Sequence, residues 1–302
     1  MAMDLCQVCG GEIGPYRHPW LSRCTRCGVL SADLPVVIPA SVTETDLDEA
    51  ARSDGLESVR RHNNERILAT LRTLDPPGRL LDVGSGPGFL LSQARDGGFS
   101  VEGIEADANT IGAARARGVP VKHGYFPEVL DQGAVFDVIV FNDVLEHIPD
   151  LRGALDASFR HLRPGGVLCL NCPDKRGFFF RVAAILDRLG VAGPYDRLWQ
   201  RGLPSPHVWY FSPALLERAA RRSGFESLTT TRLATIEVKG LWSRIRSVRN
   251  TSLIASAASF AFAVAVYPLL FLFPSDARAC FFRRGSGSDL GAAGAESSPP
   301  PT

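Results

Sequence analysis

The sequence predicts an α/β protein whose main domain is a doubly wound parallel sheet covered by helices. Residues 76–236 alternate short apolar runs with helical stretches, which is the pattern of parallel strands joined by crossover helices. The first apolar run enters a glycine-rich turn that opens a helix, so a ligand is expected at the carboxyl ends of the strands. Two pairs of cysteines before residue 34 indicate a separate small module.

The strands of the main domain are expected to follow one another in β-α-β order. Each is a short, mostly apolar or β-branched run that is bounded by turn residues. The expected strands are Arg79–Val83, Val101–Glu105, Val119–Lys122, Phe136–Phe141 and Gly166–Leu170, with a helix over Leu90–Gly97 after the first. A polar helix with one apolar face is expected before the first strand, and that face holds Ile67, Leu68, Leu71 and Leu74.

The overall charge does not require a nucleic-acid partner. The 302 residues carry a net charge of +1, and 45% of them are hydrophobic. Residues 181–250 hold 12 Arg/Lys against 5 Asp/Glu, which is either a solvated face or a patch for an anionic substrate or a membrane surface. The first ten residues lack the features of a signal peptide, so we expect a cytoplasmic protein with seven reduced cysteines.

The turn after the first strand is the most informative segment of the chain. An acidic residue precedes three glycines that are spaced GxGxG, and these residues are Asp82, Gly84, Gly86 and Gly88. Glycines lack a Cβ, so a ligand can approach the backbone amides at the start of the following helix. A dinucleotide-binding loop has its third glycine one position later, where this chain has Phe89, so the spacing disfavours an oxidoreductase.

The segment Asp82–Gly88 resembles the cofactor loop of class I S-adenosylmethionine-dependent methyltransferases, which have a Rossmann-like seven-stranded sheet. The resemblance implies that the loop wraps the methionine portion of S-adenosylmethionine, and that Asp82 orders the loop or contacts the amino group through water. In that family an acidic residue at the end of the second strand bridges both ribose hydroxyls. Glu105 stands at that position, and Asp107 is the second candidate.

Further segments resemble the same family, so the resemblance covers roughly residues 76–175. Where the family often has an acidic residue after the third strand, this chain has Tyr125 and Phe126, and these rings either stack on adenine or belong to the core. Asn142–Ile148 resembles the VLEH segment of methyltransferases of small molecules and lipid precursors, which implies that Asn142 lies within reach of the cofactor. The turn Leu162–Gly166 matches as well.

Two histidines are candidates for the chemistry. Methyl transfer needs the acceptor at attack distance and, for a hydroxyl or a carbon acid, a base such as histidine. His147 is either such a base beside the cofactor or a structural residue at a helix start. His207 lies in Pro206–Pro213, which resembles the H-x-x-F-(S/T) element that lines the acceptor side in this family. Ser212 and Pro213 also suit a helix start, so the segment has a structural role in either case.

Four cysteines near the N-terminus form two CxxC pairs, each followed by glycine, and they are Cys6, Cys9, Cys24 and Cys27. Fourteen residues separate the pairs, which is close to the spacing of zinc ribbons, so one structural Zn²⁺ is expected here. The alternative is that these cysteines are unliganded surface residues. The other three cysteines are expected in the core, and they are Cys169, Cys172 and Cys280.

A long apolar run precedes the end of the chain. Residues 250–275 carry no charge, and Ser252–Phe273 is long enough to span a bilayer. Ala279–Arg284 resembles the last strand of the methyltransferase sheet, so both ends of the run would stay on one side of any membrane. We therefore expect a re-entrant or surface-lying hairpin broken at Pro268, or a lid over a lipid-like acceptor; a helix packed on the sheet is the alternative.

The chain is expected to divide into six segments. They are a zinc ribbon (1–34), a linker and N-terminal helix (35–75), the methyltransferase domain (76–236), a basic stretch and apolar helical hairpin (237–275), the last strand (276–284) and a disordered tail (285–302).

The resemblance implies methyl transfer from S-adenosylmethionine to a small or lipid-linked metabolite, such as a sugar, a polyketide or a quinone-type acceptor. We expect the enzyme to lie on the inner face of the membrane through residues 250–275, and we expect no nucleic-acid partner. One alternative is an RNA methyltransferase that docks through the zinc module, but the nearly neutral N-terminal half argues against it. The other is a non-catalytic zinc-bearing interaction protein, and the intact cofactor motif argues against that.

Overall fold

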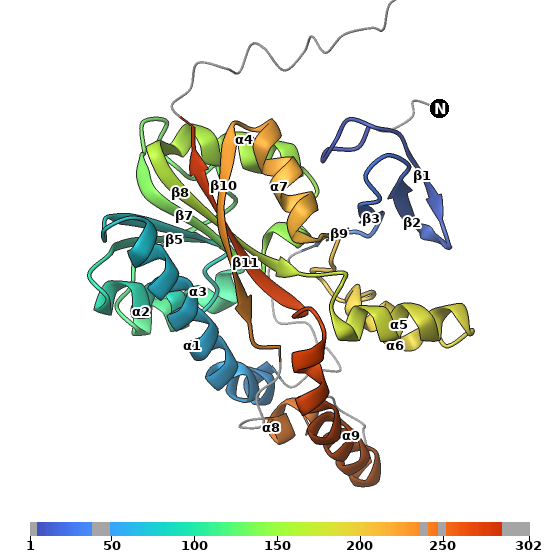
Figure 1. Ribbon diagram of the computed structural model, residues 1–302. Helices are drawn as coiled ribbons and strands as arrows, with labels where there is room; N and C mark the ends of the chain where they lie inside the picture. Colours follow the sequence, from blue (N-terminus) through green and yellow to red (C-terminus); the bar gives the residue numbers. More distant parts are fainter. Residues whose placement is uncertain (1–4, 38–48, 236–240, 247–251, 286–302) are drawn as a thin grey trace, which may run out of the picture.

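The computed structural model describes residues 5–37, 49–235, 241–246 and 252–285 (Figure 1). Within these residues the main sheet has seven strands in the order β10-β11-β8-β7-β4-β5-β6. The neighbours from β8 to β6 are parallel, whereas β11 runs antiparallel to both β8 and β10. The strands are β4 (Arg79–Val83), β5 (Ser100–Glu105), β6 (Val121–His123), β7 (Phe136–Asn142), β8 (Leu162–Pro173), β10 (Phe225–Leu233) and β11 (Ala277–Arg284). The expected seven-stranded, doubly wound α/β fold is confirmed.

Helices cover both faces of this sheet, so the domain has three layers (Figure 1). One face carries α1 (Glu49–Leu74), α2 (Phe89–Asp96) and α3 (Ala108–Ala116), and the other carries α4 (Leu151–His161) and α7 (Pro213–Arg222). On the first face, Leu71 of α1 and Leu91 of α2 pack in one cluster with Val138 of β7. Strands covered on both sides are apolar throughout, which explains the unbroken apolar runs in the sequence.

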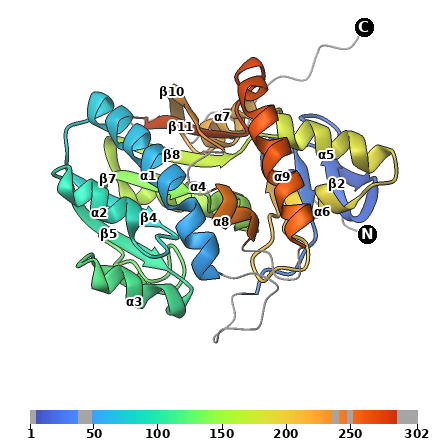
Figure 2. The same ribbon diagram turned by 90° about the horizontal axis from the view of Figure 1, so that it is seen from below.

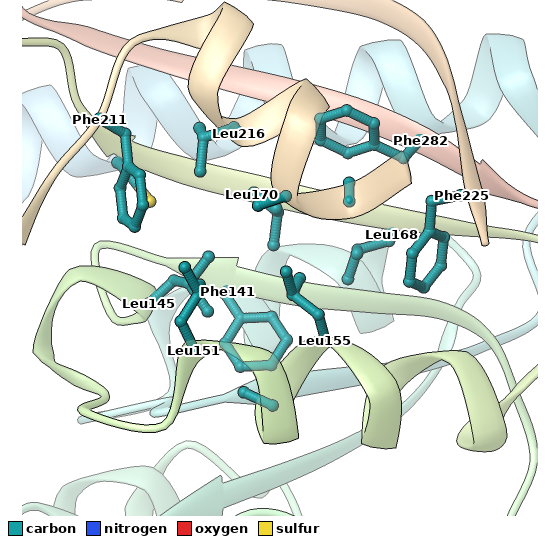
Figure 3. Close-up of a cluster of buried hydrophobic side chains, with 14 of the residues drawn as sticks. Phe141, Leu145, Leu151, Leu155, Leu168, Leu170, Phe211, Leu216, Phe225 and Phe282 are labelled. Atoms are coloured by element: carbon teal, nitrogen blue, oxygen red, sulfur yellow. The ribbon is translucent and has the colours of Figure 1, made fainter. Parts of the chain in front are cut away.

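A large apolar cluster fills the space between the sheet, α4 and α7 (Figure 3). Phe141 and Leu170 project from β7 and β8 toward Leu155 of α4 and Leu216 of α7, and Phe282 joins them from β11. Burial of each side chain stabilises the fold by about 1.5–3 kcal/mol relative to an exposed position. The cluster therefore fixes β7 and β8, at whose carboxyl ends several candidate site residues stand.

The N-terminal module is a small antiparallel sheet that a strand of the main domain completes. Its strands are β1 (Ile13–Tyr16), β2 (His18–Cys24), β3 (Leu30–Ala32) and β9 (Trp209–Tyr210), hydrogen-bonded in that order. β9 pairs with β3 through Tyr210 opposite Leu30 and Trp209 opposite Ser31. The sequence did not predict β9, because two residues are too few to show an alternating pattern.

Both cysteine turns of the N-terminal module are hydrogen-bonded to the main domain. Gln7 donates its Nε2 to the Pro149 carbonyl at 3.0 Å, and its Oε1 accepts the Arg152 amide at 3.0 Å. Lys175 donates its Nζ to the Gly28 carbonyl at 2.5 Å. The turn residues Val8 and Val29 also belong to the same apolar cluster as the α4–α7 side of the sheet. The module is thus packed into the domain.

An aromatic cluster joins the module to α5 (Phe178–Arg188) and α6 (Gly193–Leu198). The rings of Trp20 and Trp199 meet edge-to-face with centroids 5.6 Å apart. His18 lies 2.9 Å from the Asp187 carboxylate, which also pairs with Arg17. Aromatic pairs of this kind add about 0.5–1.5 kcal/mol beyond area burial, so the cluster holds α5 and α6 against the module.

The segment between β10 and β11 contains α8 (Leu241–Arg246), α9 (Leu253–Val266) and the 3₁₀ helix η2 (Tyr267–Leu272). The helical insertion before the last strand is confirmed, and α9 ends at Val266, two residues before Pro268. In the described parts of the chain, no helix has both the length and the apolar character that a membrane crossing needs. Parts of five expected segments lie outside the described residues: 1–4 of the zinc ribbon, 38–48 of the linker, 236 of the methyltransferase domain, 237–240 and 247–251 of the basic stretch, and 286–302 of the tail.

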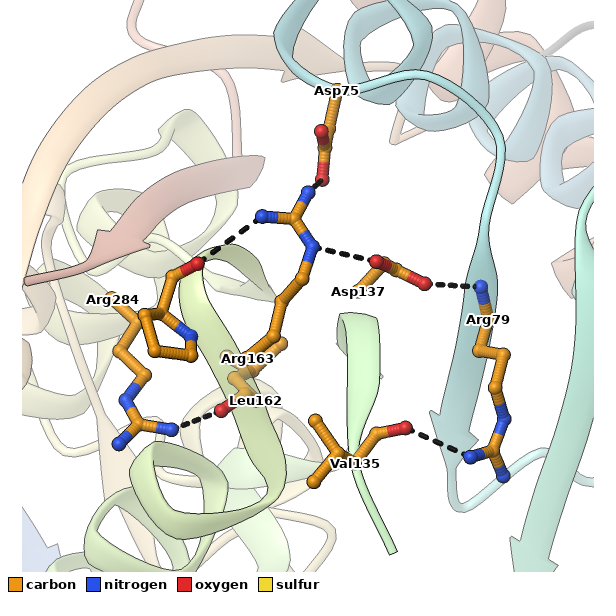
Figure 4. A network of polar contacts seen from close by, with 8 residues as sticks. Asp75, Arg79, Val135, Asp137, Leu162, Arg163 and Arg284 are labelled. Atoms are coloured by element: carbon orange, nitrogen blue, oxygen red, sulfur yellow. Dashed lines mark hydrogen bonds and ion pairs between the residues drawn. The ribbon is translucent and has the colours of Figure 1, made fainter. Parts of the chain in front are cut away.

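The turn at residues 162–166 anchors an ion-pair network at the amino-terminal edge of the sheet (Figure 4). Arg163 donates its Nε to Asp137 at 2.6 Å and its Nη2 to Asp75 at 2.5 Å. The other oxygen of Asp137 accepts the Arg79 amide at 2.6 Å, and Arg284 donates to the Leu162 carbonyl. This turn therefore ties α1, β4, β7, β8 and β11 together at the edge opposite the glycine loop.

Candidate active site

The glycines between β4 and α2 serve different purposes. Gly84 and Gly86 both have positive φ, of +70° and +51°. A Cβ on Gly84 would lie 2.5 Å from Val144 Cγ2, so a larger residue there would collide with the segment after β7. A Cβ on Gly86 would meet nothing within 4 Å, so this part of the backbone faces open space. Gly88 resembles Gly84, because a Cβ there would lie 2.7 Å from Val119.

Two acidic residues lie under this loop. Asp82 on β4 is 2% exposed, and its Oδ1 has no hydrogen-bond partner in the part of the chain that the structure describes. Burial raises the pKa of Asp82 well above its usual value, and the negative charge of Glu105 adds to the shift. Glu105 at the end of β5 accepts the Gly86 amide at 2.6 Å and the Asp107 amide at 2.8 Å. The carboxylate thus fastens the open glycine to the end of the neighbouring strand.

Glu105 also has a raised pKa, because burial outweighs the backbone amides that stabilise its charge. Both carboxylate oxygens of Glu105 accept backbone amides in this structure. For the contact with the ribose diol that the resemblance implies, at least one of these oxygens would have to accept from the diol as well. Asp107 instead caps α3, because its side chain accepts the Asn109 amide at 2.9 Å.

Asn142 ends β7 as expected, and its side chain belongs to a ladder of amides. It donates to Asn64 of α1 at 3.2 Å and accepts from Asn171 of β8 at 2.8 Å. Asn64 donates in turn to Gln93 of α2 at 2.9 Å. The ladder fastens both helices to the carboxyl ends of the central strands, which fixes this wall of the site. Among its members, sequence reasoning identified Asn142 alone.

The aromatic residues after β6 take different positions. Tyr125 is 54% exposed. Phe126 is half-buried, and its ring meets Phe141 edge-to-face at 5.5 Å between centroids. Phe126 therefore belongs to the core, and Tyr125 is the aromatic side chain that remains accessible to a ligand.

The two candidate histidines meet although they are sixty residues apart in the sequence. The rings of His147 and His207 lie edge-to-face with centroids 4.7 Å apart. His147 is in the 3₁₀ helix η1 (Leu145–His147), and its Nδ1 donates to the Pro206 carbonyl at 2.9 Å. His207 Nε2 is 2.9 Å from Gln200 Nε2, and its backbone amide donates to the Trp199 carbonyl at 3.0 Å. A neutral His147 therefore carries its proton on Nδ1, and Nε2 is its basic nitrogen.

Sequence reasoning missed Glu146, which completes this cluster. Glu146 is 1% exposed, and it offers a carboxylate oxygen within 4.8 Å of the histidine nitrogens of His147 and His207. Burial raises the pKa of Glu146 well above its usual value, and the Asp143 charge raises it further. Three such groups are close enough to contact one polar substrate group or one cation. The one sign of Glu146 in the sequence was its position next to His147.

The four N-terminal cysteines form the second such cluster in the described residues. Their ligand atoms lie within 4.8 Å of one another, with Sγ–Sγ distances of 3.7 Å for Cys6–Cys27 and 3.5 Å for Cys9–Cys24. The edge of a ZnS₄ tetrahedron is about 3.8 Å for Zn–S bonds of about 2.3 Å. The cluster is thus compact enough to hold one tetrahedral ion. The three remaining cysteines are buried, as expected: Cys169, Cys172 and Cys280.

Comparisons with known proteins agree with this architecture. The family described as "Methyltransferase domain" matches residues 56–230, which is more than half of the chain. A ubiquinone biosynthesis O-methyltransferase of Paramagnetospirillum magneticum is 42% identical over 93 residues, which cover 29% of this chain and 37% of that protein. The enzyme of that name from Psychrobacter arcticus is 26% identical over 226 residues, which cover 71% of this chain and 72% of that protein.

A solved structure from Thermotoga maritima, described as a SAM-dependent methyltransferase and possible histamine N-methyltransferase, has the same fold. Its TM-score is 0.52 at 16% identity, and the match covers 78% of this chain and 95% of that one. At such identity the likeness speaks to the fold alone. The family match agrees with three features of the structure: the glycine loop, the acidic residues beside it and the order of the strands. The chain therefore belongs to the methyltransferase-domain family and is a class I S-adenosylmethionine-dependent methyltransferase.

Proposed function

We propose that the enzyme methylates a small or lipid-linked metabolite with a quinone-type or other hydroxyl-bearing head group, and that His207 and His147 form the acceptor side of its site. The convergence of these histidines beside Glu146 carries the proposal. The relatives named for ubiquinone biosynthesis support a hydroxyl acceptor of this class.

The cofactor side of the site consists of Asp82, Gly84, Gly86, Gly88, Glu105, Tyr125 and Asn142. Two observations fit S-adenosylmethionine: Gly86 faces open space, and the buried Asp82 Oδ1 has no partner in the described residues. An ammonium group contacting Asp82, directly or through water, would satisfy that oxygen, and Glu105 would turn toward the ribose diol. The bound cofactor supplies an electrophilic methyl group on its sulfonium.

The chain's own contribution to the reaction is positioning and proton removal. His207 would accept the proton of the acceptor hydroxyl as the oxygen gains the methyl group. His147 would hold the acceptor or His207 in place, because its orientation is fixed by the Pro206 carbonyl. A cluster of one buried acid and two imidazoles suits a single hydroxyl group better than a polyanion.

We also propose that Cys6, Cys9, Cys24 and Cys27 hold one structural Zn²⁺. The ligand atoms of the four cysteines lie within 4.8 Å of one another, which suits one tetrahedral cation that would neutralise the thiolates. Gly10 and Gly28, which follow the two pairs, have φ of +72° and +70°, so the backbone turns tightly after each pair. The ion would replace the apolar core that so small a module lacks.

The proposed activity is tested by supplying S-adenosylmethionine with a radioactive methyl group together with separated lipid, small-metabolite and RNA fractions. We expect label in the lipid or small-metabolite fraction, and at least about a hundredfold less with His207→Ala. His62→Ala is the matched control, because His62 lies exposed on α1, and it should retain full activity. Label in RNA, or full activity of His207→Ala, would overturn the proposal.

A further inference from the structure

Helix α9 has an uncommon surface for a globular protein. None of its fourteen residues is charged, and most of its described side chains are exposed, including Leu253 (66%), Ile254 (84%) and Phe262 (59%). A helix that is apolar all round is normally buried in a core or in lipid. An exposed apolar surface of this kind therefore indicates a missing partner.

The exposed surface extends around most of the helix. At 100° per residue, the exposed positions from Ser252 to Ala265 sweep about two thirds of the circumference. The remaining side is held by α8, because Ser256 is buried and accepts a hydrogen bond from Arg246, and Phe260 meets Trp242 edge-to-face. A protein groove covers one side of a helix, whereas a bilayer surrounds all of an embedded helix except the side that faces its own protein.

The path of the chain excludes a crossing by this segment. It leaves the sheet after Leu233 and re-enters at Ala277, and these residues are paired partners in neighbouring strands. Both ends of the segment therefore lie at the same end of the sheet. α9 is about 21 Å long at 1.5 Å per residue, which is less than the roughly 30 Å hydrocarbon core. Figures 1 and 2 show α9 beside α8 and projecting away from the helices that cover the sheet.

The basic residues of this segment indicate that the membrane surface it binds is negatively charged. The chain between Leu233 and Ala277 contains four basic residues, which all precede the apolar helix, and two acidic residues near its ends; the basic residues are Lys239, Arg244, Arg246 and Arg249, and the acidic ones are Glu237 and Asp276. Basic residues beside an apolar helix add about 1 kcal/mol each to binding at an anionic bilayer. The same charges would not favour a second copy of this segment, because the two would repel each other.

We propose that α8 and α9 are a bilayer-docking element, with α9 embedded below the headgroups of an anionic phospholipid membrane. The element would bring the site to a membrane-held acceptor without spanning the bilayer. The catalytic consequence rests on the lipid-linked acceptor proposed above, but the binding itself does not.

The test is flotation of the full chain with vesicles of phosphatidylcholine, with or without phosphatidylglycerol. We expect the protein to float with the anionic vesicles, and the double variant Ile254→Glu/Phe262→Glu to partition at least about tenfold less. Leu5→Glu is the matched control, because Leu5 is 67% exposed outside the helical insertion. It should bind as the wild type does, and equal melting temperatures and S-adenosylmethionine affinities would show that all variants are folded.

Two results would overturn the proposal. The wild type could stay unbound with both kinds of vesicle, or the double variant could float as well as the wild type. A wild-type dimer that the double variant converts to a monomer, with no vesicle binding, would instead assign α9 to a second copy of the chain. Vesicle binding and oligomeric state are measured without methyl transfer, so a protein that does not bind vesicles leaves the proposed reaction untouched. A protein that binds vesicles but has no methyltransferase activity would contradict the proposed reaction and leave membrane binding untouched.

Discussion

At the residue scale, the three loop glycines separate into two kinds. Gly84 and Gly88 make room for protein side chains, Val144 and Val119, whereas Gly86 makes room for something outside the protein. The GxGxG spacing predicted the loop but could not distinguish these roles, because the neighbours come from distant parts of the sequence. Substitutions at Gly84 and Gly86 should therefore fail in different ways.

Gly86→Ala should keep the fold and lose cofactor affinity. Its φ of +51° costs an L-residue about 1–2 kcal/mol, but the new methyl group meets no protein atom. Gly84→Ala carries the same backbone cost, and its new methyl group also collides with Val144. Its free energy of unfolding should therefore fall by about 1–3 kcal/mol more. Thermal unfolding and calorimetric titration measure the two effects, and equal stabilities of the two variants would contradict this account.

Other residues of the site were beyond sequence reasoning for a physical reason. The positions of Asp82, Glu105 and Asn142 at or near strand ends could be predicted because a local pattern reveals those strands, and their proposed roles rest on the family resemblance. The meeting of His147 with His207 depends on how Pro206–Tyr210 packs against η1, and no local pattern encodes that packing. Asn64 is similar, since a polar residue in a polar helix gives no sign that it is buried.

At the scale of elements, the turn Leu162–Gly166 has a structural role. It resembles a family motif, yet Arg163 lies at the edge of the sheet opposite the cofactor loop, between Asp75 and Asp137. Burial alone would raise the pKa of Asp137, but the Arg79 amide and the Arg163 guanidinium lower it below its usual value. A carboxylate with a lowered pKa stabilises the fold above its unfolded pKa, and this stability is lost as pH falls through the folded value.

Arg163→Met should reduce the free energy of unfolding at pH 7 by about 1–2 kcal/mol, a figure lowered for the partial exposure of the pair. The deficit should begin to shrink below about pH 4, the usual pKa of an aspartate, and should disappear once pH falls below the lowered pKa of Asp137 in the folded wild type. Denaturant unfolding across this pH range measures it. Arg221→Met is the control, because Arg221 and Glu217 form an exposed pair one turn apart, and a similar pH-dependent loss there would refute the assignment.

Element prediction succeeded where strands were long and apolar and failed where they were short or polar. The expected Arg79–Val83 has the bounds of β4, and the expected Phe136–Phe141 differs from β7 by one residue. The three strands of the N-terminal module were missed, because their residues alternate weakly and their register depends on the cysteine turns. β10 was missed because it is largely polar, with Thr229–Thr231 at its centre.

At the scale of the whole molecule, the N-terminal module connects to the segment that carries His207. β9 completes the module's sheet and begins two residues after His207. The Val208 amide donates to the Glu146 carbonyl at 2.8 Å, so one short segment bonds to the module and to η1. The N-terminal module therefore supports the segment that carries His207, and it is packed into the main domain.

Loss of the metal should uncouple the two sides of the site. Cys9→Ser should bind no zinc, melt about 5 °C or more below the wild type and lose methyl transfer, while S-adenosylmethionine affinity changes less than about threefold. Cys280→Ser is the control for losing a buried thiol, and it should retain one zinc per chain. Elemental analysis, melting curves and titration report these quantities. A metal-free wild type with full activity would rule out the structural zinc.

The central claim is that Gly86 and its acidic partners bind S-adenosylmethionine. The most direct measurement is calorimetric titration of the purified protein with S-adenosylmethionine and S-adenosylhomocysteine, with NADH as the comparison ligand and Gly86→Arg as the blocked variant. We predict dissociation constants in roughly the micromolar range for the first two ligands, no binding of NADH, and loss of both affinities in a folded Gly86→Arg. Binding of NADH in place of S-adenosylmethionine, or undiminished binding by Gly86→Arg, would contradict the account.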